Sequence, residues 1–122
     1  MENLKYEKIK SFILTVDGKS SSGKSTAAKL LAKKFQIPHL SSGLLYRWAA
    51  KKILNKKPKN KIFYLKKCFK KFNYNSLKNT NLHKPEVSAY SAVIARILTV
   101  RIIVKKAQKS WVQKNKKRCV VE

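Results

Sequence analysis

Acidic residues are scarce in this sequence, and their scarcity sets its overall charge. Five of the 122 residues are Asp or Glu, against 30 Lys and Arg, which gives a formal net charge of +25. Such a charge attracts polyanions, so nucleic acid is the first partner to consider. However, few of the basic residues are Arg, and the lysines occur throughout the chain beside Asn and Ile. This distribution indicates a general compositional bias, and nucleic acid is not the expected partner.

Glycine, proline, cysteine and long apolar runs are also scarce. Three Gly and three Pro exclude a low-complexity protein, and a hydrophobic fraction of 43% is typical of a folded one. Cys68 and Cys119 match no metal or redox spacing, so free thiols are expected. The apolar stretch 93–104 is interrupted by Arg96 and Arg101, and the charged N-terminus is not typical of a signal peptide. We expect a single cytoplasmic domain without a membrane partner.

Strand and helix patterns alternate along the chain. Residues 12–16 form a short β-forming run, typical of a buried parallel strand, and two further strands are predicted at 37–40 and 119–122. Apolar periodicity predicts helices over 25–35, 44–54 and 62–72, and from about residues 85 and 99. Residues 73–82 are rich in Asn and leave room for one short strand. These patterns predict an α/β fold with a parallel sheet and flanking helices.

A phosphate-binding signature lies between the first predicted strand and the first predicted helix. Residues 18–25 match the P-loop pattern G-x-x-x-x-G-K-[ST] at every fixed position. The two glycines let the backbone amides surround phosphate oxygens, Lys24 would reach the β- and γ-phosphates, and the Ser25 hydroxyl would bind Mg²⁺. The expected ATP-binding residues are therefore Gly18, Lys19, Ser20, Ser21, Ser22, Gly23, Lys24, Ser25 and Thr26.

Asp17 precedes this loop and is the one aspartate in the sequence. Its carboxylate could hold a water bound to the Mg²⁺ ion. It could equally pair with Lys19 or with the backbone of the loop. The sequence leaves both interpretations open.

Two segments resemble the bacterial cytidylate kinases, a family of P-loop nucleoside monophosphate kinases. The first is 16–32, which contains the loop, and the second is 40–47, Leu-Ser-Ser-Gly-Leu-Leu-Tyr-Arg. A weaker third match begins at Pro85-Glu86-Val87-Ser88, and the resemblance covers about 12–54 and 82–122. It differs from the family pattern at Ser41, where an aspartate is usual, and at Ala92, where the third motif usually has a serine. The sequence leaves open whether the adjacent Ser91 takes the place of that serine.

The resemblance implies Mg²⁺-dependent transfer of the ATP γ-phosphoryl group to CMP or dCMP by a monomeric enzyme. By similarity, Lys24, Arg47 and Arg101 are the expected catalytic residues. Ser42, Arg47 and Arg101 are the expected contacts to the acceptor nucleotide. Cations at both nucleotides also suit the charge that spreads over a transferring phosphoryl group.

Three regions follow from this resemblance. Residues 1–54 would be the P-loop front section of the kinase core, 55–84 a small basic acceptor-binding insertion, and 85–122 two helices and the start of the next strand. In the family that strand continues into a Gly-Arg-Asp segment and later an arginine-bearing lid. We therefore expect a C-terminally truncated chain with an incomplete core, which binds ATP but turns it over little or not at all.

Two other functions remain open from the sequence. The chain could be another small-molecule P-loop kinase, such as a relative of adenylate or shikimate kinase. It could also be a non-enzymatic basic protein that binds nucleic acid.

Overall fold

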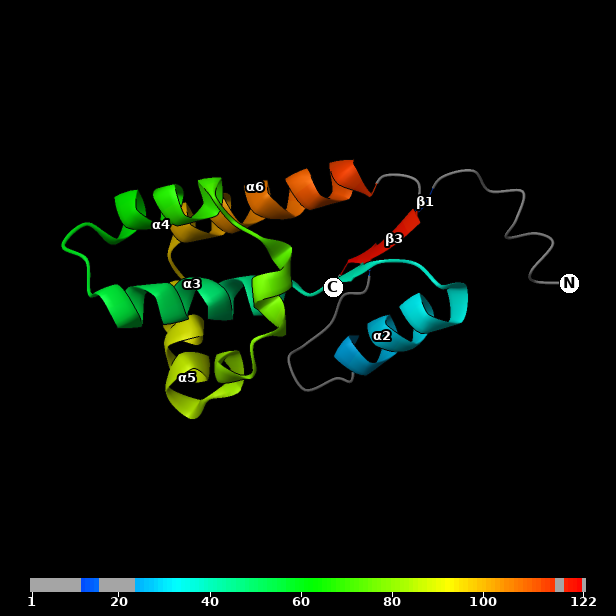
Figure 1. The fold of residues 1–122 in the computed structure, drawn as a ribbon, viewed down its shortest axis with the longest axis horizontal. Coiled ribbons are helices and arrows are strands. Elements are labelled where there is room, and N and C mark those ends of the chain that lie inside the picture. The colour runs from blue at the N-terminus through cyan, green and yellow to red at the C-terminus, as the bar shows by residue number, and fades with distance from the viewer. Residues whose placement is uncertain (1–11, 16–23, 116–117, 122) are drawn as a thin grey trace, which may run out of the picture. The chain divides into compact units, whose positions relative to one another are not determined.

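The chain divides into two compact units, which are described separately (Figure 1). The structure, a computed structural model, describes residues 12–15, 24–115 and 118–121. A sheet unit comprises residues 1–41 and 108–122, and a helical unit comprises residues 42–107.

The sheet unit contains three parallel strands in the order β1-β3-β2. They are β1 (Phe12–Thr15), β2 (His39–Leu40) and β3 (Arg118–Val121), so the strands predicted near residues 12, 37 and 119 are confirmed. β3 is the central strand and pairs with both others, Thr15 and Leu40 each lying opposite Val121. β2 is shorter than the predicted 37–40. It begins directly after Pro38, whose nitrogen has no hydrogen to donate to a sheet.

Helix α2 (Lys24–Phe35) connects β1 to β2 and contacts both β2 and β3. Its buried residues are Ala28 and Ala32, against which Leu31 and Ile37 pack. The apolar periodicity over 25–35 also includes Ala27 and Leu30, but the structure buries neither of them: Ala27 is exposed and Leu30 is 62% exposed. Two small alanines allow the helix backbone to approach closely, and this narrow contact leaves the neighbouring positions in solvent.

The C-terminus of α2 is closed by a Schellman motif. The Ile37 N–H donates to the Ala32 carbonyl at 3.0 Å, and the Gln36 N–H donates to the Lys33 carbonyl at 3.3 Å. This arrangement requires a left-handed residue after the helix, and Gln36 occupies that position with φ of 53°. Glycine adopts this conformation without the steric cost that a Cβ atom brings, so Gln36 holds local strain.

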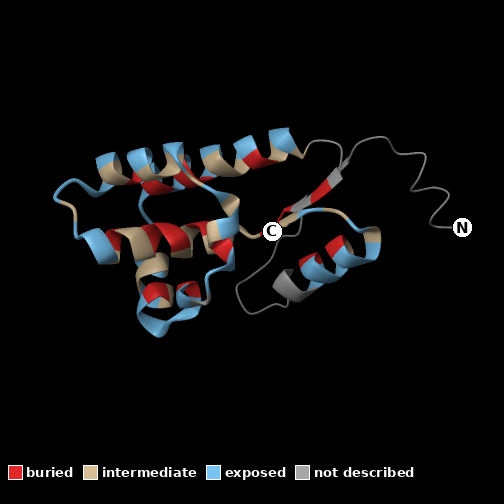
Figure 2. Cartoon of the chain, in the orientation of Figure 1, coloured by how far each residue is buried: buried red, intermediate tan, exposed pale blue. Residues whose placement is uncertain are grey.

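The helical unit is organised around α3 (Ser42–Lys56), which contacts both α4 (Lys61–Lys70) and α5 (Pro85–Ile94) (Figure 1). Four residues of the apolar periodicity over 44–54 are buried in α3, and Ala50 is buried with them. The four are Leu45, Trp48, Ala49 and Ile53. Figure 2 shows the buried parts of α3 in red. Helix α6 (Leu98–Lys114) begins in this unit, where it buries Val100, Ile103 and Val104.

The Asn-rich segment forms two 3₁₀ helices, η1 (Tyr74–Lys78) and η2 (Thr80–His83), so the short strand considered there is wrong. Asparagine side chains explain the difference. The Asn73 Oδ1 accepts from the Asn75 N–H, and the Asn79 Oδ1 accepts from the Asn81 N–H, both at 2.9 Å. These local bonds favour tight turns over an extended backbone.

Helix α5 is shorter than its apolar pattern indicates. Apolar residues at helical spacing continue through Val93 to Ile97, but α5 ends at Ile94 and both of these residues are exposed. In the described part of the chain no single helix is long and apolar enough to cross a membrane. Helices α5 and α6 pass that test only as a pair, bent by 104° at the break between them.

Replacing Gln36 with Gly is expected to stabilise the chain. Glycine removes the Cβ clash of the left-handed conformation and keeps both capping hydrogen bonds, so the free energy of unfolding should rise by about 0.5–1 kcal/mol. Thermal unfolding followed by circular dichroism measures the change. Lys33→Gly, inside the same helix, is the matched control and should lower stability by about 1 kcal/mol. A loss of stability in Gln36→Gly would show that the strain is absent.

Candidate active site

The candidate site begins at the carboxyl edge of the parallel sheet. β1 ends at Thr15 and α2 begins at Lys24, so the P-loop signature connects a parallel strand to a helix, as predicted. Asp17 and residues 18–23 of the signature lie outside the described residues. The backbone of Lys24, Ser25 and Thr26 forms the first turn of α2. A P-loop requires this strand–loop–helix order.

The N-terminus of α2 is suited to an anion. The first N–H groups of a helix have no partner inside the helix, and the helix dipole adds partial positive charge at this end. No acidic side chain lies in the first turn of α2 to compete for these groups. A phosphate is therefore favoured at this position on electrostatic grounds.

The second predicted segment leaves the same edge of the sheet. β2 ends at Leu40, which lies opposite Val121 just as Thr15 does, so β1 and β2 end level with each other. β3 separates them, which puts their ends about 10 Å apart at the usual strand spacing. Ser41 stands where the family pattern has an aspartate. It follows β2 directly and is half-buried. The last residues of β1 and β2 thus flank the end of the central strand.

The residues predicted to contact the acceptor lie in the helical unit. Ser42 is the first residue of α3, and Arg47 follows on the second turn; both are half-buried. Arg101 lies on the first turn of α6 and is exposed. Neither guanidinium forms an ion pair with any described residue. In the sequence, Glu86 is the one acidic residue between 42 and 107. Both arginines are therefore available to a phosphate group.

The third motif forms bonds within its own helix. The Ser91 Oγ donates a hydrogen bond to the Ser88 carbonyl at 2.7 Å, within α5. Ala92, where the family pattern expects serine, is exposed. The Ser91 hydroxyl is thus bonded to its own helix in this structure.

An aromatic cluster supports the helix that carries Arg47. Trp48 contacts Phe69 and Phe72 with ring centroids 4.9 and 4.6 Å apart, and Phe72 contacts Tyr74 at 4.6 Å. The Tyr74 hydroxyl donates to the Ala107 carbonyl at 2.8 Å. The sequence pattern identified the inward stripe of α3 and α4 but missed Tyr74, which follows α4 in an irregular, polar segment.

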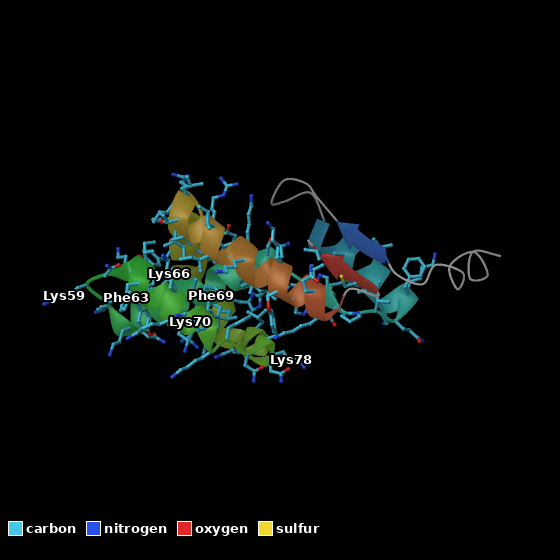
Figure 3. The ribbon with its side chains drawn as sticks, turned by 90° about the horizontal axis from the view of Figure 1, so that it is seen from above. Lys59, Phe63, Lys66, Phe69, Lys70 and Lys78 are labelled. Carbon is cyan, nitrogen blue, oxygen red and sulfur yellow. The ribbon has the colours of Figure 1, made fainter. Side chains whose placement is uncertain are left out.

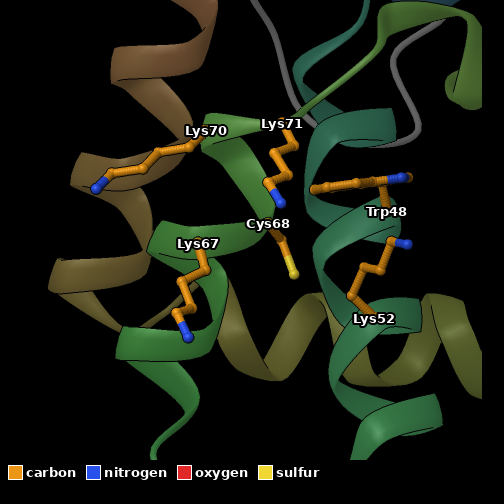
Figure 4. Close-up of a pocket in the computed structure, with 6 residues that line it drawn as sticks. All are labelled: Trp48, Lys52, Lys67, Cys68, Lys70 and Lys71. Carbon is orange, nitrogen blue, oxygen red and sulfur yellow. The ribbon is translucent and has the colours of Figure 1, made fainter.

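A pocket of about 550 Å³ opens beside this cluster, between α3 and α4 (Figure 4). Trp48 and Lys52 line it from α3, and the residues from α4 and its C-terminus are Lys67, Cys68, Lys70 and Lys71. The Lys52 Nζ lies 5.4 Å from the centre of the Trp48 ring, a cation–π contact. Nearby, burial and a hydrogen bond with the Cys68 side chain raise the pKa of Tyr64.

The described residues contain no group of three or more His, Cys, Asp or Glu side chains able to hold a metal ion. A magnesium ion at this site would instead depend on the Ser25 hydroxyl, on the phosphates of the nucleotide and on Asp17. This donor set is compatible with Mg²⁺, which prefers oxygen ligands and keeps several waters.

Comparison with known proteins identifies the family. A family model described as cytidylate kinase matches residues 14–122. The cytidylate kinase of Bartonella quintana is 32% identical over 108 residues, which are 84% of this chain and 48% of that protein. That of Acidiphilium cryptum is 32% identical over 91 residues, covering 73% of this chain and 42% of the relative. That of Brucella ovis is 47% identical over 45 residues, which are 37% of this chain and 20% of that protein.

The parallel sheet, with α2 connecting β1 to β2, places the chain in the α/β class. The chain belongs to the cytidylate kinase family, so the resemblance in the sequence is confirmed, and membership implies the P-loop NTPase fold. The two Bartonella relatives align with 84% of this chain, but the chain spans only about half of their length.

The two thiols should react at very different rates. Cys119 is fully buried in the central strand, and burial raises the pKa of its thiol, so less of it is thiolate at a given pH. Thiolate is the reactive form, and Cys68 is only half-buried. Iodoacetamide at pH 8 should therefore modify Cys68 first, as measured by mass spectrometry.

The Cys68→Ser variant isolates Cys119 and provides the control. Alkylation of Cys119 should be fast only in denaturant. Without denaturant, its alkylation rate should begin to increase at a higher pH than the rate of a free cysteine does, because its pKa is raised. Native alkylation of Cys119 as fast as free cysteine would contradict its burial.

Proposed function

We propose that this chain contributes the ATP- and acceptor-binding portion of a nucleoside monophosphate kinase that transfers the γ-phosphoryl group of ATP to CMP or dCMP. The observation that carries the proposal is the family match over 14–122, together with the P-loop signature between β1 and α2. ATP and Mg²⁺ are the proposed cofactors.

In this proposal the sheet unit binds ATP, and residues of the helical unit bind the acceptor nucleotide. The amides of residues 18–23 and the first turn of α2 surround the phosphates of ATP, Lys24 reaches across them, and Ser25 with Asp17 holds Mg²⁺. Ser42, Arg47 and Arg101 bind the phosphate of the acceptor. Opposed cations of this kind lower the charge repulsion between donor and acceptor phosphates and neutralise the transferring group.

We further propose that residues 55–84 act as the acceptor-binding insertion. They lie in the sequence between the P-loop region, residues 1–54, and the helices and strand of residues 85–122. Transfer depends on residues that close around both nucleotides and exclude water. The chain spans 48% of the Bartonella quintana relative, and we propose that these 122 residues bind nucleotides and transfer phosphate little or not at all. We also propose a monomer in the cytoplasm.

Lys24→Ala is expected to weaken ATP binding at least tenfold. The variant removes the ammonium group that contacts the β- and γ-phosphates, and charge-assisted hydrogen bonds of this kind each contribute about 1.5–3 kcal/mol. Anisotropy of a fluorescent ATP analogue with Mg²⁺ measures the affinity. Lys29→Ala, an exposed position on the same helix, is the matched control and should bind like the parent. Equal affinity of the parent and Lys24→Ala for the ATP analogue would contradict the proposed ATP site.

Arg47→Ala is expected to weaken CMP binding by about ten- to a hundredfold, since a guanidinium can hold a phosphate with two hydrogen bonds. Calorimetric titration of CMP into the chain, with a non-hydrolysable ATP analogue present, measures the affinity. Arg96→Ala is the matched control, because Arg96 is an exposed arginine of the same unit to which no role is assigned.

A panel of acceptors in the same assay separates the proposal from related kinases. CMP and dCMP should bind more tightly than AMP or shikimate. A clear preference for AMP or shikimate, or equal losses in Arg47→Ala and Arg96→Ala, would contradict the proposed acceptor site.

A further inference from the structure

Helix α4 carries an exposed row of cations around one aromatic ring. We call this the α4 surface and define it by Lys59, Phe63, Lys66, Lys67 and Lys70, all of which are exposed. Phe63, Lys66 and Lys70 are three and four positions apart on α4, so they follow one side of the helix for about 10 Å. Lys59 lies just before the helix, next to its N-cap Asn60. Figure 3 shows Lys59, Phe63, Lys66 and Lys70 in succession.

The ring distinguishes this surface from the other lysine-bearing helices. Lysines are exposed on α2 and α6 as well, so positive charge alone marks no particular site. The described part of the chain has six exposed large hydrophobic side chains, and Phe63, 58% exposed, is the one aromatic among them. The Lys67 Nζ lies 5.1 Å from the centre of its ring. An exposed ring beside a cation offers one stacking face and one phosphate contact within a few ångströms of each other.

Within residues 24–115, no carboxylate forms an ion pair with these lysines. Glu86 is the one acidic residue between 42 and 107 in the sequence, and it lies at the start of α5. Lys66 and Lys70 are four residues apart on one helix, a spacing at which like charges repel and weaken the helix. A bound polyanion would relieve this repulsion and release the counterions of its own phosphates.

The pocket between α3 and α4 extends this surface. Lys67 and Lys70 belong to both, and Lys52 and Lys71 add two further cations at the pocket (Figure 4). Its volume of about 550 Å³ lies within the usual range for small-ligand sites. One nucleotide of a longer strand therefore has room beside the helix.

An anionic membrane fits this surface less well. A helix that binds a lipid surface buries its apolar side among the acyl chains. The apolar side of α4 is already used inside the helical unit, where Leu65 is fully buried and Phe69 packs against Trp48. A single exposed Phe with lysines around it instead resembles the combination used by sequence-tolerant binders of single strands.

We propose that the α4 surface binds single-stranded RNA, with phosphates on Lys59, Lys66 and Lys70 and one base stacked on Phe63. This is an activity in addition to the proposed kinase function and does not depend on it. Recognition by phosphates and by one ring predicts little sequence preference and a strong dependence on salt.

The test uses a fluorescein-labelled uridine oligonucleotide of about 12 residues and measures anisotropy between about 50 and 200 mM NaCl. The triple variant Lys59→Gln, Lys66→Gln, Lys70→Gln should lose at least about tenfold in affinity and should reduce the slope of log affinity against log salt by about two. The matched control is Lys84→Gln, Lys105→Gln, Lys106→Gln, which removes equal charge from exposed positions of the same unit and should lose less than about threefold.

Phe63 tests the stacking contact separately from charge. Phe63→Ala should lose about five- to a hundredfold in affinity with an unchanged salt slope, while Phe63→Tyr should bind like the parent. Circular dichroism and thermal unfolding check that each variant is folded. Phe63→Leu, which keeps an apolar side chain without a ring, should behave like Phe63→Ala.

Several outcomes would overturn the proposal. These are equal losses in the two triple variants, equal binding of Phe63→Ala and the parent, or binding to vesicles with anionic lipid but not to RNA. Equal affinity for duplex and single-stranded RNA would also overturn it. Lys24→Ala, which disables the proposed ATP site, should keep full RNA affinity, so failure of either proposal can be recognised without the other.

Discussion

The parallel pairing of β1 with β3 is the constraint on which the sheet unit depends. It aligns Thr15 with Val121, residues from opposite ends of the chain, and this long-range contact carries a loop-closure entropy that local helices avoid. Burial of Cys119 and Val121 in the central strand offsets some of that cost. Because β2 pairs with β3 and not with β1, the strand in the middle keeps the two outer strands level. The start of α2 and Ser41 share one sheet edge for this reason.

The helical unit has a comparable centre in α3. Ala49 and Ala50 are small and fully buried, so neighbouring helices can approach the α3 backbone closely, while Trp48 fills the space towards Phe69 and Phe72. Two of the proposed acceptor residues, Ser42 and Arg47, lie on the same helix as these buried side chains. Arg47 directly precedes Trp48, so the packing that fixes the tryptophan also limits the rotation of the helix that carries the arginine. A proposed binding residue on such a helix is better oriented than one on a loop.

Local signals explain what the sequence predicted well. A short β-forming run, a glycine-bounded loop and a helix in that order identify a P-loop from neighbouring residues alone, and three strands and the principal helices follow from periodicity. Two of the errors occur where tertiary contacts decide. Leu30 fits the apolar stripe of α2 but lies outside the narrow contact that Ala28 and Ala32 make. The hydrogen bond from Tyr74 to Ala107 joins residues 33 apart and has no local signature. For the loop itself, at 18–23, the sequence remains the basis of the assignment.

The shortage of acidic residues also limits how this protein can discriminate between anions. In a chain with a net charge of +25, a positive potential reaches every phosphate nearby and gives little selectivity. Selectivity must then come from groups with fixed geometry. At the proposed ATP site these are backbone amides at the start of α2, which cannot rearrange as lysine side chains can. At the α4 surface the fixed group is the Phe63 ring, which contacts a base and ignores an inorganic anion. In these proposals the lysines attract both nucleotides and RNA. The backbone amides then favour the phosphates of ATP, and the Phe63 ring favours the bases of RNA.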